Sequence, residues 1–208
     1  MKRSVPILIY AIVQFIAFLL VLVGTPLDMF RFNSLTRSVT RCLTLWGYKE
    51  RCSSSSIDSP LNVVWEECPV RLRRFYVAQA LAIVSILVYG AAFVLGVIML
   101  FCCSFLRFVC LTLNIVGVAT LCVVWVAMTM TFSKDEGGIC VDFQSVSHYG
   151  AGFALLVTAW VLDILNIFIL LLRFRIAVFR DLDSANDKSD ETSKGESEVS
   201  NTQKEEEE

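Results

Sequence analysis

Charged and titratable side chains are scarce in this chain of 208 residues, and the motifs of the common enzyme classes are missing from it. Charged residues make up 18% of the sequence, and His148 is the only histidine. There is no Gly-rich phosphate loop, no H-E-x-x-H pair, no nucleophile elbow and no convergent pair of carboxylates. We therefore expect no enzymatic activity, no cofactor, no metal site and no nucleic-acid partner. For His148 we expect only an interfacial hydrogen bond.

Apolar residues, in contrast, are abundant, at 56% of the chain with a mean hydropathy of +0.65. A bilayer core of about 30 Å requires roughly 20 apolar residues per helix. Four segments satisfy this, at about 5–27, 77–101, 105–132 and 149–172, and they are apolar nearly all round rather than striped. We predict a membrane all-α fold, in which residues 1–180 form an antiparallel bundle of four transmembrane helices in the lipid bilayer.

Four spans place both termini on one side of the membrane, and loops of about 28–76 and 133–148 on the other. The first apolar run is longer than the apolar core of a cleavable signal peptide, so we interpret it as an uncleaved signal anchor. The positive-inside rule gives poor guidance here. Arg71, Arg73 and Arg74 fall in the long loop and argue against cytoplasmic termini. The basic chain ends and the weakness of the rule for long loops favour cytoplasmic termini, with the protein in the plasma membrane.

Residues 181–208 differ from the rest in composition. They contain eleven acidic residues against three lysines and almost no apolar side chains. Such a segment cannot bury enough surface to offset its ordering entropy. We expect a disordered, acidic, cytoplasmic tail.

The cysteines of the two loops are even in number, which suits an oxidising compartment. They are Cys42, Cys52, Cys68 and Cys140. The spacing of Cys42 and Cys52 is too wide for a zinc site, and C-x-x-C is absent. We expect disulfides, with Cys42–Cys52 and Cys68–Cys140 preferred and a Cys52–Cys68 pairing as the rival.

The first loop also predicts a small antiparallel sheet. The segments RSVTRCLTLW and NVVWEEC are rich in β-branched and aromatic residues, and Gly47 supplies a turn. A sheet of this size is marginal by itself, so the disulfides are expected to brace it. Trp46 and Trp65 are expected to cover the sheet or to rest at the lipid interface.

The eleven residues CLTLWGYKERC, 42–52, resemble the signature of the amastins, surface membrane proteins of trypanosomatid parasites. Ten positions agree with the family pattern C-[apolar]-[TS]-[LF]-[WF]-G-x-[KRQ]-x-[DENT]-C, and Arg51 departs from it. The residues that carry the motif are Cys42, Thr44, Leu45, Trp46, Gly47, Lys49 and Cys52. Amastins in turn resemble the claudins, four-helix proteins with a β-sheet in the first extracellular loop. The chain has no N-x-S/T sequon, although amastins are often called glycoproteins.

The resemblance implies a non-enzymatic cell-surface protein that acts in host-cell contact, a host–parasite interaction, or in the integrity of the surface membrane. Its partners would be proteins or lipids of an apposed membrane, or further copies of the chain. The alternative is a transport or channel subunit that uses Asp163, because an ionisable residue within a span suggests function.

Depth along the helices groups Asp163 with other polar residues into one intramembrane layer, formed by Gln14, Asn114, Asp163 and Asn166. Hydrogen bonds within such a layer hold helices together. Near the cytoplasmic ends of the second and third spans, Cys102, Cys103 and Cys110 are candidates for S-acylation, with plain apolar packing as the alternative.

Overall fold

The structure is a computed structural model that describes residues 5–32, 40–54, 56–101, 106–134, 140, 143–144 and 147–172. The chain divides into two units, Met1–Phe168 and Ile169–Glu208. Of the second unit, only the helical residues 169–172 are described. The predicted acidic tail, 181–208, lies outside the described residues.

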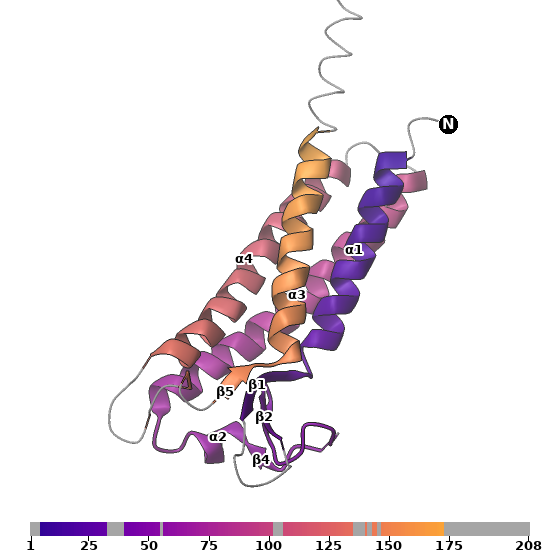
Figure 1. The fold of residues 1–208 in the computed structure, drawn as a ribbon. Helices are drawn as coiled ribbons and strands as arrows, with labels where there is room; N and C mark the ends of the chain where they lie inside the picture. Colours follow the sequence, from indigo (N-terminus) through magenta and orange to yellow (C-terminus); the bar gives the residue numbers. More distant parts are fainter. Residues whose placement is uncertain are drawn as a thin grey trace, which may run out of the picture. The chain divides into compact units, whose positions relative to one another are not determined.

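Four helices are long and apolar enough to cross a membrane. They are α1 (Val5–Gly24), α3 (Pro69–Phe101), α4 (Leu106–Ser133) and a fourth helix, Ala151–Leu172. In the first unit they run side by side, and the strands lie at one end of them (Figure 1). This confirms the predicted membrane fold, a four-helix bundle with a small sheet in the first loop.

The helix boundaries differ from the prediction chiefly at α3, which begins at Pro69 rather than near residue 77. Proline suits the first position of a helix because its fixed φ is already helical and its missing N–H would have no helical partner. With 33 residues, α3 is about 50 Å long at 1.5 Å per residue. It therefore extends well beyond an apolar core of about 30 Å.

Aromatic side chains join neighbouring helices. Phe15 of α1 lies 5.0 Å from Phe93 of α3, measured between ring centroids. Trp160 of the fourth helix lies 5.5 Å from Trp125 of α4 and donates from Nε1 to the Val118 carbonyl at 3.2 Å. Each helix is thus packed against a neighbour through side chains that fill a large volume.

The sheet has five strands in the order β4-β3-β2-β1-β5, and every pair is antiparallel. The strands are β1 (Asp28–Phe32), β2 (Arg41–Thr44), β3 (Gly47–Lys49), β4 (Ser59–Pro60) and β5 (Ser147–Tyr149). The edge strand β5 comes from the second loop and pairs with β1, with Phe30 opposite Tyr149. The two loops therefore form one sheet rather than two separate structures.

The predicted strand in NVVWEEC is wrong. Leu61–Val64 forms the short helix α2, which follows Pro60 directly. Trp65 donates from its backbone N–H to the Leu61 carbonyl at 2.9 Å, and the Cys68 N–H donates to the Trp65 carbonyl at 3.0 Å. These turns lead straight into α3, so the β-branched composition of the segment is overridden by its local hydrogen bonds.

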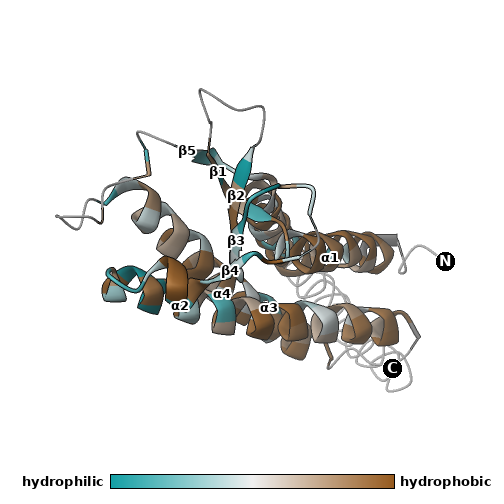
Figure 2. Ribbon diagram, turned by 90° about the horizontal axis from the view of Figure 1, so that it is seen from below, coloured by the Kyte–Doolittle hydropathy of each residue, from teal (hydrophilic) through white to brown (hydrophobic). Residues whose placement is uncertain are grey.

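Side chains on the inner face of the sheet attach it to three helices. Phe30 of β1 is fully buried and stacks 6.0 Å from Phe132 of α4. Gln79 of α3 donates to the Leu45 carbonyl at 2.7 Å, and Trp46 donates to the Thr25 carbonyl, just after α1, at 3.2 Å. Figure 2 shows the helices largely hydrophobic, with hydrophilic residues gathered on the strands and the adjoining helix ends. The sheet is therefore held firmly on one end of the bundle.

Candidate functional site

The segment from Cys42 to Cys52 folds as a hairpin closed by a disulfide. Cys42 lies in β2, Cys52 follows β3, and the two Cα atoms are 5.2 Å apart. The Cys52 N–H donates to the Thr40 carbonyl at 3.2 Å, and Lys49 Nζ donates to the Ser54 carbonyl at 3.0 Å. The disulfide thus ties the end of the hairpin back to the start of β2.

Thr44 and Gly47 shape the turn between β2 and β3. The Thr44 hydroxyl accepts from the N–H groups of Trp46 and Gly47, both at 3.1 Å, and donates to the Gly47 carbonyl at 2.9 Å. A Cβ on Gly47 would lie 2.5 Å from Ile57 Cγ2 and 2.6 Å from the Ser59 carbonyl oxygen. Only glycine fits at this position without displacing the neighbouring strand. Leu45, in the turn, is fully buried, and its carbonyl accepts from Gln79 of α3.

A second disulfide joins Cys68, directly before α3, to Cys140 in the second loop, with the Cα atoms 6.1 Å apart. Beside it, Arg71 is buried to 1% exposure. Its guanidinium carbon lies 5.1 Å from the Trp65 ring and 4.9 Å from the Phe143 ring, and Nη2 donates to the Cys140 carbonyl at 3.1 Å. Aromatic faces and carbonyl dipoles stabilise this buried cation. Arg71, near the start of α3, is therefore buried rather than exposed. It links Trp65, before the helix, to Cys140 and Phe143 of the second loop.

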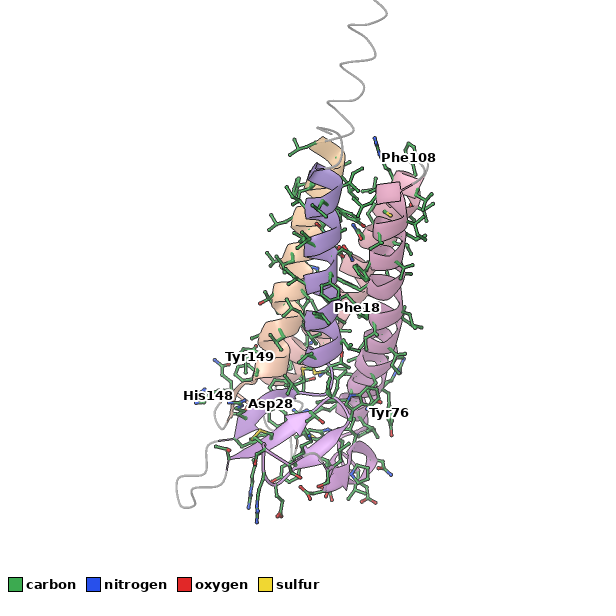
Figure 3. All side chains as sticks on the ribbon, turned by 90° about the vertical axis from the view of Figure 1, so that its right-hand side faces the viewer. Phe18, Asp28, Tyr76, Phe108, His148 and Tyr149 are labelled. Carbon is green, nitrogen blue, oxygen red and sulfur yellow. A yellow bond between two sulfur atoms is a disulfide. The ribbon has the colours of Figure 1, made fainter. Side chains whose placement is uncertain are left out.

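Asp28 connects the sheet to the start of the fourth helix (Figure 3). Its carboxylate accepts from Arg31, with Nη2 at 3.2 Å from Oδ1, and from the N–H of Ala151 at 3.3 Å, the first residue of that helix. Burial would raise the pKa of Asp28, but the hydrogen bond and charge of Arg31 and the backbone N–H groups outweigh it and lower the pKa. A carboxylate at a helix N-terminus satisfies a free N–H and complements the helix dipole.

Ionisation of other groups on the sheet follows the same physics. The hydrogen bond and charge of Asp28 raise the pKa of Arg31. Partial burial raises the pKa of the Tyr48 phenol. The positive charge of Arg41 lowers this pKa, and the negative charge of Glu50 raises it further. Among the residues that the structure describes, no group of three or more His, Cys, Asp or Glu side chains could hold a metal ion. The site thus consists of two disulfides and of charged side chains, such as Asp28 and Arg71, that are held by hydrogen bonds.

Comparison with protein families decides what this architecture is. The family model described as "Amastin surface glycoprotein" matches residues 15–170. The chain belongs to the amastin family. It is a multi-pass surface membrane protein, as the resemblance of its hairpin motif predicted. A comparison of this amastin with curated proteins gives no match.

The residues of the amastin motif have distinct structural roles in the hairpin. Thr44 and Gly47 build the turn, Leu45 and Trp46 fix it to the helices, and the cysteines close it. Arg51, the position that departs from the family pattern, is exposed. His148 is also exposed, in the edge strand β5, opposite Arg31 of β1.

The polar layer lies inside the amastin bundle, where Gln14, Asn114, Asp163 and Asn166 are each at most 1% exposed. Asn166 Nδ2 donates to Gln14 Oε1 at 2.7 Å, whereas Asn114 Nδ2 donates to the Tyr10 hydroxyl at 3.3 Å. Asp163 does not join either pair. A Cβ added to Gly117 would lie 3.0 Å from Asp163 Oδ2 and 2.9 Å from Cε2 of the Tyr89 ring. Gly117 of α4 therefore lies beside both Tyr89 of α3 and Asp163 of the fourth helix.

Of the cysteines considered for S-acylation, Cys102 and Cys103 lie outside the described residues. Cys110 is a free thiol with no exposed surface, within α4. A thiol that faces the bundle interior is unsuited to acylation, which requires access to the thiolate. Its position supports the alternative of plain apolar packing.

Sequence reasoning missed β1, β5, Asp28 and Arg71 as parts of the site. For Asp28 and β5 no local signal existed, because their partners are far apart in the chain. Hydropathy alone places Arg71 in the long loop, although Pro69, two positions before it, signals a helix start.

Proposed function

We propose that this amastin is a non-enzymatic contact and structural protein of the plasma membrane, with its sheet outside the cell and both termini cytoplasmic. The sheet would meet proteins or lipids of an apposed membrane, such as that of a host cell, or neighbouring copies. Two disulfides on the side of the sheet support this orientation, since disulfides persist in oxidising compartments.

The observation that carries the proposal is the rigidity of the sheet. Two cross-links and the attachments of Phe30, Gln79 and Trp46 fix it to the helix ends. A surface that is already ordered loses little conformational entropy when it binds. Exposed side chains beside the hairpin, including Glu50, Arg51 and Ile57, would supply polar and apolar contacts.

The test is a contact assay with the full chain in vesicles whose sheet-side loops face outward, as selected by sensitivity to added protease. Clustering with protein-free vesicles and with vesicles carrying the protein would be followed by light scattering. We expect Cys52→Ser to reduce clustering at least several-fold. Cys122→Ser, which removes a free thiol within α4, is the matched control and should change nothing. Equal clustering by both variants would contradict the proposal.

Orientation needs its own measurement. Membrane-impermeant thiol reagents would be applied to each side of intact and permeabilised cells, before and after reduction. We expect Cys42, Cys52, Cys68 and Cys140 to react only from outside and only after reduction. Free thiols at these positions facing the cytosol would refute the proposed topology and role together.

A second function, transport of protons or cations, is favoured by one observation. Asp163 is fully buried, and the Tyr89 side chain lies beside its carboxylate. Placing such a group in a span is costly, so a functional reason is expected. Proton flux into vesicles, read with an enclosed pH dye, would be compared between the natural chain and Asp163→Asn. A flux lost in the variant supports transport, and the absence of flux in the natural chain excludes it.

A further inference from the structure

An open cavity of about 260 Å³ lies at the end of α3 nearest the sheet. Four of its lining residues, Val70, Arg73, Arg74 and Val77, are spaced i, i+3, i+4 and i+7 along α3 and so share one helix face. Ala127 of α4 completes the lining. The small side chain of Ala127 leaves the space that a larger residue would fill. The cavity thus has apolar walls from two helices and two guanidinium groups from one.

Helix length, counted from Phe101 at the opposite end of α3, indicates that the cavity lies at about the level of the lipid headgroups. Val77 is 24 positions before Phe101, the end of α3, which places it about 36 Å along the helix. That is just beyond an apolar core of about 30 Å. Tyr76, an exposed aromatic residue on this part of α3, occupies the depth where tyrosine is enriched in membrane proteins (Figure 3). Val70 and Val77 are also exposed, at 55% and 44%.

The charged residues within the first two turns of α3 are all basic, although the exposed Glu66 and Glu67 lie just before the helix. The first turn contains no acidic residue, and Arg71, Arg73 and Arg74 lie in the first two turns, where the helix dipole disfavours cations. Arg71 is buried among Trp65, Phe143 and the second loop. Arg73 is exposed, and the ion pair found in the described parts of the chain joins Arg31 to Asp28, away from it. A bound phosphate would neutralise the repulsion at Arg73.

We propose that this cavity binds one phospholipid from the leaflet on the side of the sheet. The phosphodiester contacts Arg73, with Arg74 at the cavity wall, and the first methylenes of an acyl chain cover Val70, Val77 and Ala127. A volume of 260 Å³ suits this part of a lipid rather than a whole molecule. A guanidinium matches a phosphate through paired N–H donors. The apolar walls match the first methylenes of an acyl chain, which a soluble phosphate lacks.

The experiment uses the full chain in a neutral detergent and a phosphatidylcholine that carries a photoreactive group near the start of one acyl chain. Crosslinked peptides would be identified by mass spectrometry, and affinity would be obtained by competition with dioleoylphosphatidylcholine. We expect crosslinks to α3 near Val77 and to α4 near Ala127. A basic side chain near a membrane surface contributes about 1 kcal/mol, so Arg73→Gln should weaken binding about fivefold. Arg73→Lys should retain most of the affinity.

Two matched controls separate the cavity from general effects. Arg41→Gln removes an exposed charge on β2, and Ala91→Phe adds bulk to an exposed position of α3 outside the cavity. Both should bind as the natural chain does, whereas Ala127→Phe should abolish the crosslinks. Ala127→Leu is a milder filling variant in case the phenylalanine impairs folding.

The competitors provide the decisive outcomes. Dioleoylglycerol, which lacks the phosphate, and glycerophosphocholine, which lacks the acyl chains, should each compete at least fivefold more weakly than the full lipid. Equal competition by either compound would overturn the assignment. Equal weakening by Arg73→Gln and Arg41→Gln, or crosslinks that survive Ala127→Phe and Ala127→Leu, would overturn it as well.

Discussion

Removing either disulfide of this amastin should destabilise it by a similar amount, although the two bonds close loops of very different length. The sequence separations are 10 residues for Cys42–Cys52 and 72 for Cys68–Cys140. For a chain that unfolds in water, the loop-entropy relation gives about 2.7 kcal/mol for the first and about 4.4 kcal/mol for the second. On that basis the longer loop should cost about 1.7 kcal/mol more to open.

The bilayer removes this difference. Cys68 directly precedes α3, and Cys140 follows Ser133, the end of α4, by seven positions. If α3 and α4 stay inserted and packed against each other when the sheet and the loops unfold, their axes remain about 10 Å apart. The disulfide then closes a flexible segment of roughly eight residues, which corresponds to about 2.5 kcal/mol in the same relation.

The assay is reversible unfolding of the full chain in bicelles by added sodium dodecyl sulfate, followed by tryptophan fluorescence. The two double variants are Cys42→Ala/Cys52→Ala and Cys68→Ala/Cys140→Ala. Each pair combines one buried and one half-buried side chain, so the loss of packing is matched. We expect the two losses of unfolding free energy to agree within about 0.5 kcal/mol. A loss larger by about 1.7 kcal/mol for the second pair would refute the reasoning.

Three further predictions concern the bundle and its junction with the sheet. Gly117→Ala should lower the free energy of unfolding by about 1–3 kcal/mol in the same assay, because its Cβ would lie 2.9 Å from Tyr89 and 3.0 Å from Asp163. Gly90→Ala is the control and should cost less, since its Cβ would meet only Phe18, at 3.3 Å. Equal costs would contradict this reasoning. Arg71→Gln should cost about 2 kcal/mol or more, because it leaves the Cys140 carbonyl without its donor, and Arg73→Gln in lipid-free detergent is the control that should stay near zero. Asp28 should stabilise the fold above its ordinary pKa of about 3.9, because its folded-state pKa is lowered, and this contribution should disappear as the pH falls through the folded-state value. Unfolding measured between neutral and acidic pH should show a shallower pH dependence for Asp28→Asn, and an unchanged slope would refute the role of Asp28.

The four helices were predictable because their signal is local and strong. Twenty apolar residues in succession exclude most alternatives, whatever the rest of the chain does. The family was predictable from the hairpin motif, whose residues contact one another within eleven positions. Boundaries were less well predicted, since a helix such as α3 continues past the membrane into water, where Pro69 rather than hydropathy determines its start.

The remainder depends on contacts between distant segments. β5 is a strand because it lies beside β1, and Leu61–Val64 is a helix despite its two valines because Pro60 and the following turns fix its backbone. Position along the helices places Gln14 at the level of Asp163, but the side chain that Gln14 contacts is Asn166. Depth along a helix is readable from sequence, whereas the rotation of one helix against another depends on packing at residues such as Gly117.

The bond between Cys68 and Cys140 turns α3, α4 and their connection into a covalent ring. A single backbone cut by a protease within residues 134–139 would therefore leave both products attached to each other. The nicked protein would migrate as one species in electrophoresis until a reductant is added. A cell that exposes such a protein to proteases can lose a peptide bond in the second loop without losing any of the four helices from the membrane.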